Sequence, residues 1–400
     1  MSSSFSNFKP HITPNSFLTF AVAKSGDGKR NGTSNPMLSK TSTLVYFISG
    51  NPGLISYYHL FFSLLSSELS SQRGSEGSNG SSTEEPSPYI IRGRSLGGFE
   101  VPDPRSGEDD GKSQLERVYG LRDEIAFMER DLEEFVRAWQ STIQAEHGLK
   151  ERPRANVIIM GHSVGAYIAM EIMRRRREKL GLQRKIGNET LAQTTCEHGD
   201  GLGLDIIGGI MLFPTVVDIA KSPNGKILTK LLYIPYLPLI VSMLARFLVY
   251  ILPELVLYRI VSQVMRYPRK EAVETTVSML KNSYIVRQAL HMAADEMQEI
   301  SADKWSDELW GFSSPLNPPE DKLTKMVFYF GRNDHWVAET TREEIIRPKA
   351  KAKQEAPGPV MTVCEDGVVH GFCIGHNEIM AKKVGQFIRD IVRESEGVDR

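Results

Sequence analysis

The stretch ANVIIMGHSVGAYIAMEIM, residues 155–173, combines three local patterns in direct succession. Residues 155–160 form a short apolar run that is typical of a buried strand. Residues 161–165 follow as G-x-S-x-G, and residues 166–179 continue with helical periodicity. Such a strand–turn–helix unit predicts a sharp turn, permitted by its glycines, that raises the Ser163 hydroxyl above the edge of a sheet.

That position suits a nucleophile, because backbone N–H groups lie nearby to bind a developing oxyanion. The N–H of Val164 follows Ser163 directly, at the positive end of the predicted helix. A second donor is expected from the loop SGNPG, residues 49–53, which follows an early apolar run. Asn51 has a backbone N–H and Pro52 has none. Asn51 and Val164 are therefore the predicted oxyanion donors; the alternative for the loop is a purely structural Pro-Gly turn.

A carboxylate and an imidazole follow the serine in the order that a Ser-His-Asp triad requires. The apolar run 325–330 ends just before Asp334, and the run 359–364 precedes His370. Both side chains are expected at the carboxyl edge of a parallel sheet, where catalytic groups gather. In this hypothesis Ser163 attacks an acyl carbonyl, His370 moves the proton to the leaving group, and Asp334 orients the imidazole.

Other residues compete for two of these roles. Asp218 lies shortly after another predicted strand and is a second candidate acid. His335 adjoins Asp334, and His376 lies near the start of the final predicted helix, so both compete with His370. Asp334 also suits an Asx-turn without chemistry, and a glycine-rich strand–helix turn can be structural only.

The remaining pattern alternates strands with helices. Further strands are predicted at residues 16–24, 44–48, 89–94 and 206–213, and further helices at residues 56–69, 121–143 and 377–394. Near-continuous apolar strands separated by helices predict an α/β fold with a mostly parallel central sheet covered on both faces. Two polar stretches are predicted as loops, residues 70–88 (a mobile insertion) and residues 181–203.

Composition narrows the class of protein. The 400 residues are 40% hydrophobic, enough for a large core, and the net charge of −1 offers no field that would attract nucleic acid. Cys196, Cys364 and Cys373 are odd in number and form no CxxC pair, which favours reduced thiols in an intracellular compartment. The N-terminus lacks the pattern of a signal peptide. No metal or organic cofactor is expected, because the predicted site supplies base, nucleophile and oxyanion donors.

Residues 227–261 are unusually apolar. Prolines and Arg246 interrupt the run, whereas a transmembrane span needs about 20 apolar residues with few charges. A monotopic helix pair in one leaflet fits better, with Lys226, Lys230 and Arg246 near headgroups. The alternatives are a cap that buries its apolar face over the site, and a dimer interface. The predicted division is a flexible lead-in (1–40), a core in two parts (41–225 and 301–400) and a hydrophobic helical insertion (226–300).

Several of these motifs together resemble the lipid droplet-associated hydrolase family. The resemblance rests on residues 49–54 before 56–58, residues 161–167, residues 211–215 with 222–225, and residues 334–336 with His370. It implies an α/β-hydrolase fold, a Ser163–Asp334–His370 triad, and targeting to lipid droplets and the endoplasmic reticulum through residues 227–261.

The same resemblance implies that the substrates are esters of neutral lipids, sterol esters or acylglycerols, hydrolysed without a cofactor. Two other functions stay open from the sequence. One is a non-catalytic protein that organises lipid droplets at the surface of the droplet or the endoplasmic reticulum. The other is a soluble thioesterase or esterase for apolar acyl compounds. The sequence does not define the oligomeric state.

Overall fold

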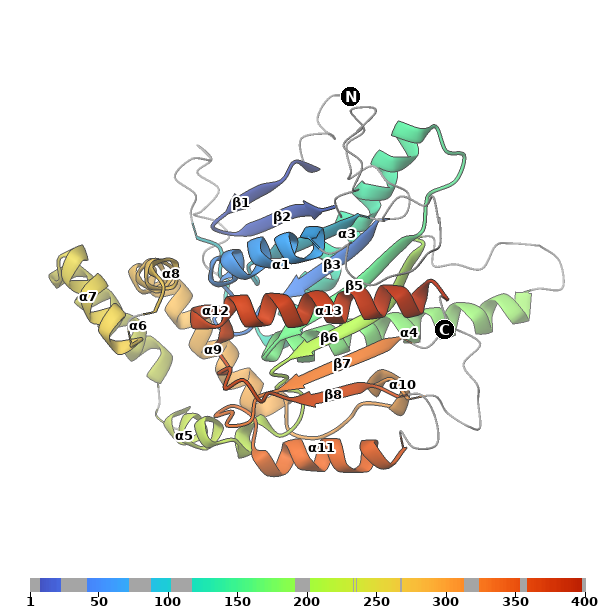
Figure 1. Ribbon diagram of the computed structural model, residues 1–400. Coiled ribbons are helices and arrows are strands. Elements are labelled where there is room, and N and C mark those ends of the chain that lie inside the picture. Colours follow the sequence, from blue (N-terminus) through green and yellow to red (C-terminus); the bar gives the residue numbers. More distant parts are fainter. Residues whose placement is uncertain are drawn as a thin grey trace.

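The computed structural model describes residues 8–22, 42–71, 88–101, 117–190, 202–232, 234, 236–266, 268–312, 324–352 and 358–397. One sheet lies at its centre, with the strand order β1-β2-β4-β3-β5-β6-β7-β8 (Figure 1). The strands are β1 (His11–Thr13), β2 (Ser16–Ala21), β3 (Thr43–Ile48), β4 (Tyr89–Arg94), β5 (Ala155–His162), β6 (Leu204–Leu212), β7 (Lys325–Phe330) and β8 (Val360–Val363). β2 is antiparallel to β1 and β4, and the other neighbouring strands are parallel. The predicted mostly parallel sheet is confirmed.

Helices cover both faces of this sheet. They and the short 3-10 turns are η3 (Ile55–Tyr58), α1 (His59–Ser71), α3 (Leu121–His147), α4 (Val164–Thr190), η4 (Ile219–Lys221), α5 (Pro223–Leu232), α6 (Leu237–Ile251), α7 (Glu254–Val264), α8 (Lys270–Lys281), α9 (Ser283–Glu299), α10 (Asp307–Trp310), α11 (Glu339–Ala352), α12 (Phe372–Gly375) and α13 (Asn377–Ser395). α1 and α13 pack together on one face, and α3 and α4 lie on the other (Figure 1).

Alternation along the strands explains the two layers. Val45 and Phe47 of β3 join the apolar cluster under α1 and α13, whereas Leu44, Tyr46 and Ile48 join the cluster under α3 and α4. Successive side chains of a strand point to opposite faces. Every residue of β3 is buried, and all but Thr43 are apolar, as expected for a parallel strand covered on both sides.

Two predictions about the ends of elements need correction. The loop predicted for residues 181–203 was wrong at its start, because α4 continues to Thr190. Residues 191–201 lie outside the described residues, and residues 202–203 precede β6 outside any helix or strand. A glycine inside a helix costs only about 1 kcal/mol, so Gly181 does not end α4. The strand predicted for residues 16–24 ends at Ala21, and the end of that range lies outside the described residues.

The predicted mobile insertion at residues 70–88 begins inside α1, and residues 72–87 lie outside the described part of the chain. Within the predicted flexible lead-in, residues 11–21 instead form β1 and β2 at one edge of the sheet. Burial of Phe17 and Leu18 on opposite faces of β2 accounts for that order. Cys364 is buried, and Cys196 lies outside the described residues.

A helical insertion, α5–α9, separates β6 from β7 in the sequence. α8 and α9 lie close to the ends of the strands, and α6 and α7 project from that end of the molecule (Figure 1). Small side chains bring α6 against α9, since the buried residues of α6 are Ser242 and Ala245. In the described part of the chain, no helix combines the length and the apolar character needed to cross a membrane.

Candidate active site

Ser163 lies on the turn between β5 and α4 with a φ of 55°, in the left-handed region. Such a conformation is strained for a residue with a side chain. The flanking glycines permit it: a Cβ on Gly161 would come within 2.3 Å of the Gly165 carbonyl oxygen, and one on Gly165 within 2.3 Å of the Ile48 carbonyl oxygen. The G-x-S-x-G spacing therefore follows from backbone contacts that leave no space for a methyl group.

The structure brings the three predicted side chains together. Nε2 of His370 lies 2.9 Å from Oγ of Ser163, and Nδ1 of His370 lies 2.8 Å from Oδ2 of Asp334. The Asp334 side chain is 1% exposed and that of His370 is 15% exposed. Asp334 also forms the predicted Asx-turn, because its Oδ1 accepts a hydrogen bond from the Trp336 N–H at 2.8 Å. That turn orients the carboxylate toward His370.

The alternative candidates for the acid and the base make other contacts. Asp218 precedes η4 and pairs with Lys221 at 2.7 Å. His335 is exposed, and its carbonyl oxygen accepts the N–H of Asn224 at 2.9 Å. His376 stands at the start of α13. Among the described residues, the hydrogen-bonded Ser-His-Asp arrangement is thus made by Ser163, His370 and Asp334.

The loop that follows β3 lies against the nucleophile. A Cβ on Gly50 would lie 3.0 Å from Cβ of Ser163. The side-chain amide of Asn51 donates to the Ala289 carbonyl oxygen and to Oε1 of Glu296, both at 2.9 Å, and both partners belong to α9. As the first residue of α4, Val164 has an N–H that no helical hydrogen bond uses. The assignment of the Asn51 and Val164 N–H groups as oxyanion donors stays a prediction.

Glu296 is a buried carboxyl group that the sequence analysis missed. Burial raises its pKa from 4.5 to about 8; the hydrogen bond from Asn51 lowers the pKa and nearby Asp295 raises it. At neutral pH this carboxyl group is therefore mostly protonated. Glu296 connects the loop after β3 to the helical insertion across 245 residues of sequence, a separation that no local pattern reveals.

His162 and Tyr58 also escaped prediction, although both belong to motifs discussed above. Nδ1 of His162 lies 2.7 Å from the Tyr58 hydroxyl, and its Nε2 lies 2.8 Å from the carbonyl oxygen of His370. Burial, followed by the proximity of His370, lowers the pKa of His162 from 6.5 to about 3. The ring is thus neutral at physiological pH.

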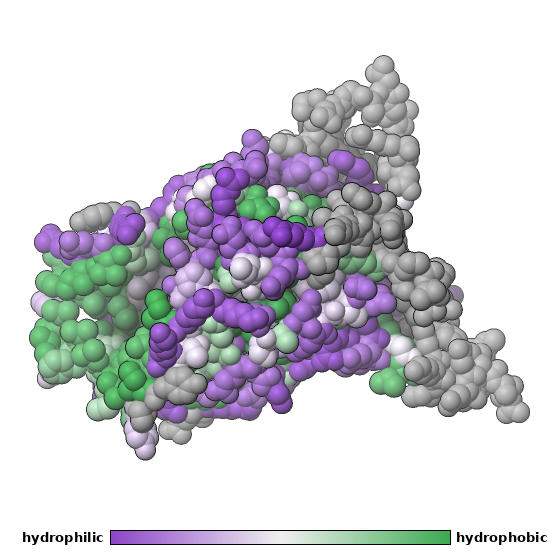
Figure 2. Space-filling view, turned by 90° about the horizontal axis from the view of Figure 1, so that it is seen from below, coloured by the Kyte–Doolittle hydropathy of each residue, from purple (hydrophilic) through white to green (hydrophobic). Residues whose placement is uncertain are grey.

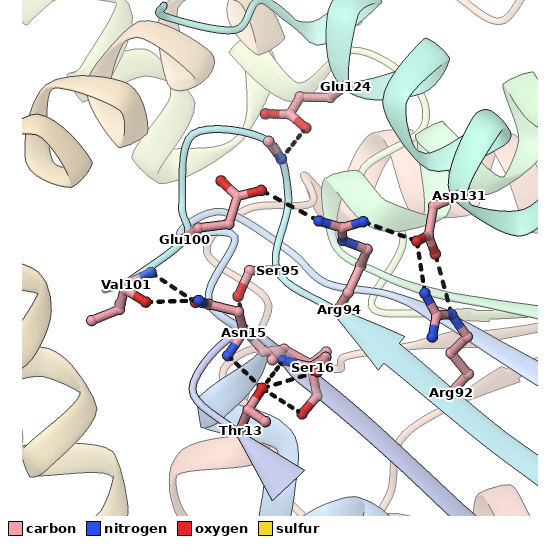
Figure 3. Close-up of polar contacts among 12 residues, drawn as sticks. Thr13, Asn15, Ser16, Arg92, Arg94, Ser95, Glu100, Val101, Glu124 and Asp131 are labelled. Atoms are coloured by element: carbon pink, nitrogen blue, oxygen red, sulfur yellow. Dashed lines mark hydrogen bonds and ion pairs between the residues drawn. The ribbon is translucent and has the colours of Figure 1, made fainter. Parts of the chain in front are cut away.

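A cluster of charged side chains lies beside β4 and holds the segment that follows this strand. Arg92 and Arg94 point from β4 toward Asp131 on α3, at 2.7 and 3.0 Å (Figure 3). Burial alone raises the pKa of Asp131, but the two guanidinium groups more than offset that effect, so the pKa is lowered. Glu124, nearer the start of the same helix α3, accepts a hydrogen bond from the Gly97 N–H at 2.8 Å. These contacts fix the segment after β4.

That segment in turn supports the loop after β3. The N–H of Leu96 donates to the Gly53 carbonyl oxygen at 2.9 Å, and a Cβ on Gly53 would lie within 2.6 Å of Leu96. The cluster of charged side chains therefore contributes to the position of the loop that lies against Ser163. Across the described residues, no group of three or more His, Cys, Asp and Glu side chains is arranged to hold a metal ion.

An extended apolar surface covers the projecting part of the insertion (Figure 2, left). We define this apolar surface by its exposed large side chains: Ile227, Leu231, Ile234, Tyr236, Leu239, Ile240, Met243, Leu244, Phe247, Leu248, Tyr250, Ile251, Leu255, Val256, Ile260 and Val264. Tyr250 is 89% exposed and Met243 64%. The surface begins beside the candidate site, since the hydrogen bond from Asn224 to His335 joins the start of α5 to the loop that carries Asp334.

The fold and the site together define a class. A serine on a strained strand-to-helix turn, followed in sequence by an acid after β7 and a histidine after β8, is the arrangement of an α/β-hydrolase. The chain matches the family described as "Lipid-droplet associated hydrolase" over residues 41–373. It therefore belongs to that family, and the predicted fold class and family are confirmed.

Relatives of the same description occur in distant animals. The chain is 25% identical over 362 residues to the lipid droplet-associated hydrolase of Gallus gallus, covering 87% of this chain and 85% of the relative. It is 23% identical to the human protein of that name over 354 residues, covering 88% and 86%. Similar solved structures include DBJA, with a TM-score of 0.48, 10% identity and coverage of 98% and 99%. Another is the peroxisomal alpha-beta-hydrolase Lpx1 from Saccharomyces cerevisiae, with a TM-score of 0.43, 9% identity and coverage of 95% and 89%.

Proposed function

We propose that this protein is a serine hydrolase that cleaves carboxylic esters of neutral lipids, sterol esters or acylglycerols, at the surface of lipid droplets. The observation that carries the proposal is the hydrogen-bonded chain from Ser163 through His370 to Asp334. Each member of this chain has the partner that its role requires. The hydroxyl meets the base, and the base meets a buried carboxylate.

The mechanism follows from these contacts. Nε2 of His370 accepts the Ser163 proton as Oγ attacks the ester carbonyl, and the developing oxyanion is bound by the N–H groups of Val164 and Asn51. His370 then donates the proton to the leaving alcohol. Water, activated by the same imidazole, releases the fatty acid from the acyl-enzyme. Asp334 holds the tautomer of His370 and stabilises the imidazolium.

The apolar surface supports docking on a phospholipid monolayer. Most of α6 faces outward, and its large side chains remain exposed instead of being buried in protein, which favours lipid contact over a closed cap. Lys226 and Lys230 lie on α5, next to this surface, where cationic side chains can reach phosphate headgroups. We propose monotopic attachment to lipid droplets and to the cytosolic face of the endoplasmic reticulum, through residues 227–261.

Substitution of the nucleophile tests the chemistry. Wild type and Ser163→Ala are assayed on artificial droplets containing cholesteryl oleate or triolein, and both are incubated with a fluorophosphonate probe. We expect the variant to lose labelling and at least roughly 1000-fold in kcat. Ser63→Ala, on the exposed part of α1, is the matched control. Labelling that persists in Ser163→Ala contradicts the assignment. Droplet effects that survive Ser163→Ala without any measurable hydrolysis favour the non-catalytic alternative.

A second experiment tests the apolar surface. Burying the Met243 and Phe247 side chains contributes about 1.5–3 kcal/mol each, so Met243→Asp/Phe247→Asp is expected to weaken flotation with droplets by roughly 100-fold or more. Leu182→Asp changes an equally exposed leucine on α4, at 60% exposure, and is expected to float normally. If the double variant floats like wild type, or instead converts a dimer to a monomer, lipid docking by this surface is rejected.

A further inference from the structure

A single hydrogen-bonded chain runs from the loop after β3 to the main chain of the candidate base. The Gly50 N–H lies 3.2 Å from the Tyr58 hydroxyl, which lies 2.7 Å from Nδ1 of His162. Nε2 of His162 lies 2.8 Å from the carbonyl oxygen of His370. The chain therefore joins the two segments that flank Ser163, and it includes neither the Ser163 hydroxyl nor the His370 ring.

Elementary hydrogen-bond chemistry sets the direction of this chain. A carbonyl oxygen only accepts, so Nε2 of the neutral His162 ring carries the proton and donates a hydrogen bond to the carbonyl oxygen of His370. Nδ1 of His162 is then an acceptor, and the Tyr58 hydroxyl donates to it. The oxygen of Tyr58 is left to accept the N–H of Gly50. Every donor and acceptor of the two side chains is satisfied in one consistent arrangement.

The surroundings keep this arrangement dry. Phe372 contacts the rings of both Tyr58 and His162, with centroids 6.0 and 5.0 Å apart, and Phe213 lies 6.0 Å from His162. The thiol of Cys373 and the hydroxyl of Tyr57 are titratable groups near Tyr58, and burial raises the pKa of the thiol to about 12. The nearest charge-bearing side chain in the mechanism is His370 itself, whose ring centroid is 5.2 Å from that of His162.

We propose that Tyr58 and His162 are positioning residues that hold the loop after β3 and the His370 backbone at fixed places on either side of Ser163. This inference rests on the proposed function and adds two residues to it. His162 and Ser163 are neighbours at the end of β5, so the side chain of one holds the main chain of His370 while the side chain of the other meets its imidazole. The separation between nucleophile and base is thereby set from two adjacent positions.

A neutral ring at position 162 also suits the reaction. During catalysis His370 becomes an imidazolium, and a second positive charge on His162 would oppose it, because the two ring centroids are 5.2 Å apart. Burial keeps His162 uncharged, so its contribution to His370 is a single N–H donated to a carbonyl oxygen. The effect of His162 on His370 therefore depends on one atom, Nε2, and substitutions can keep or remove a donor at that place.

Two amide substitutions separate the two ring nitrogens. In His162→Gln the side-chain amide nitrogen can occupy the place of Nε2 and donate to His370, whereas in His162→Asn the amide oxygen replaces Nδ1 and the donor to His370 is lost. A displacement of about 1 Å at a catalytic group can lower the rate by about 100-fold. We expect His162→Asn to lose roughly 10- to 100-fold in kcat with little change in KM, and His162→Gln to retain most of it.

Tyr58→Phe provides an independent variant, since it removes the hydroxyl that joins Gly50 to His162. We expect a fall in kcat of about tenfold, through the same loss of position. Tyr57→Phe is the matched control: the same change one residue away removes a hydroxyl that pairs with Thr276 of α8 at 2.8 Å. Thermal melts confirm folding, and the proton NMR signal of the His370 Nδ1–H reports the position of the imidazole directly.

The outcomes distinguish this proposal from the proposed function. Equal kcat values for His162→Asn and His162→Gln, with the His370 signal unmoved in Tyr58→Phe, overturn the positioning roles. Wild-type protein that neither hydrolyses esters nor reacts with the fluorophosphonate probe overturns the proposed function instead. In that case the His370 signal in the same variants still tests the hydrogen-bonded chain.

Discussion

Replacement of Glu296 by glutamine is the perturbation with the clearest pH signature. The carboxyl group is buried on α9 and accepts a hydrogen bond from Asn51 at 2.9 Å. Glutamine keeps an oxygen that can accept this bond and cannot ionise. Because burial raises the pKa of Glu296 from 4.5 to about 8, the folded protein binds this proton more tightly than the unfolded chain.

The sign of the pH dependence follows. Below pH 4.5 the carboxyl group is protonated in both the folded and the unfolded state, and its contribution to the free energy of unfolding is fully present. As the pH rises from 4.5 toward 8, only the unfolded chain ionises. Ionisation stabilises the unfolded chain and so lowers the free energy of unfolding. At 1.36 kcal/mol per pH unit, the loss of folding free energy is about 1 kcal/mol at pH 5, about 3 at pH 7 and about 5 at pH 9. Glu296→Gln removes this loss.

Urea unfolding of wild type and Glu296→Gln at pH 5, 7 and 9 measures the difference in the free energy of unfolding. We expect the advantage of the variant to grow by roughly 2 kcal/mol from pH 5 to 7, and further to pH 9. Glu299→Gln, at the more exposed end of the same helix and with a side chain 35% exposed, controls for the loss of one negative charge. An advantage that is the same at all three pH values refutes the burial argument.

Three further substitutions test other parts of the structure. Asp334→Asn is expected to lower kcat for ester hydrolysis on the order of 10⁴-fold by removing the partner that fixes the His370 tautomer; a loss below tenfold contradicts the triad. Gly165→Ala places Cβ 2.3 Å from the Ile48 carbonyl oxygen, and we expect a loss of more than about 2 kcal/mol in urea unfolding. Gly181→Ala meets open space within α4 and is expected to stabilise by about 0.5–1 kcal/mol; no gain would indicate that α4 ends before this residue.

Local patterns predicted the parts of the fold that depend on local physics. The strand before Ser163, the turn and the helix after it are adjacent in sequence, so apolar periodicity and two glycines were sufficient. Asp334 and His370 were predicted from their places after strands, because parallel strands bring their carboxyl ends to one edge. The end of α4 was missed because Gly181 weakens a helix without ending it.

Contacts between distant segments could not be predicted in this way. His162 was one of the variable positions in G-x-S-x-G, and nothing near it in the sequence indicates Tyr58, 104 residues earlier. Asn51 was noted for its backbone N–H, yet its side chain is held by α9, more than 200 residues later. Such pairs depend on how the helical insertion sits on the sheet, which propensity and periodicity do not encode.

The helix α9 gives the apolar surface and the candidate site a common support. On one side α9 packs against α6, whose small Ser242 and Ala245 are buried while its large side chains point outward. On the other, α9 receives the Asn51 amide through Ala289 and Glu296. The helix that packs against the inner face of α6 is therefore the same helix that holds the loop beside Ser163. The projecting helices are therefore not independent of the candidate site, because α9 both packs against α6 and holds the loop after β3.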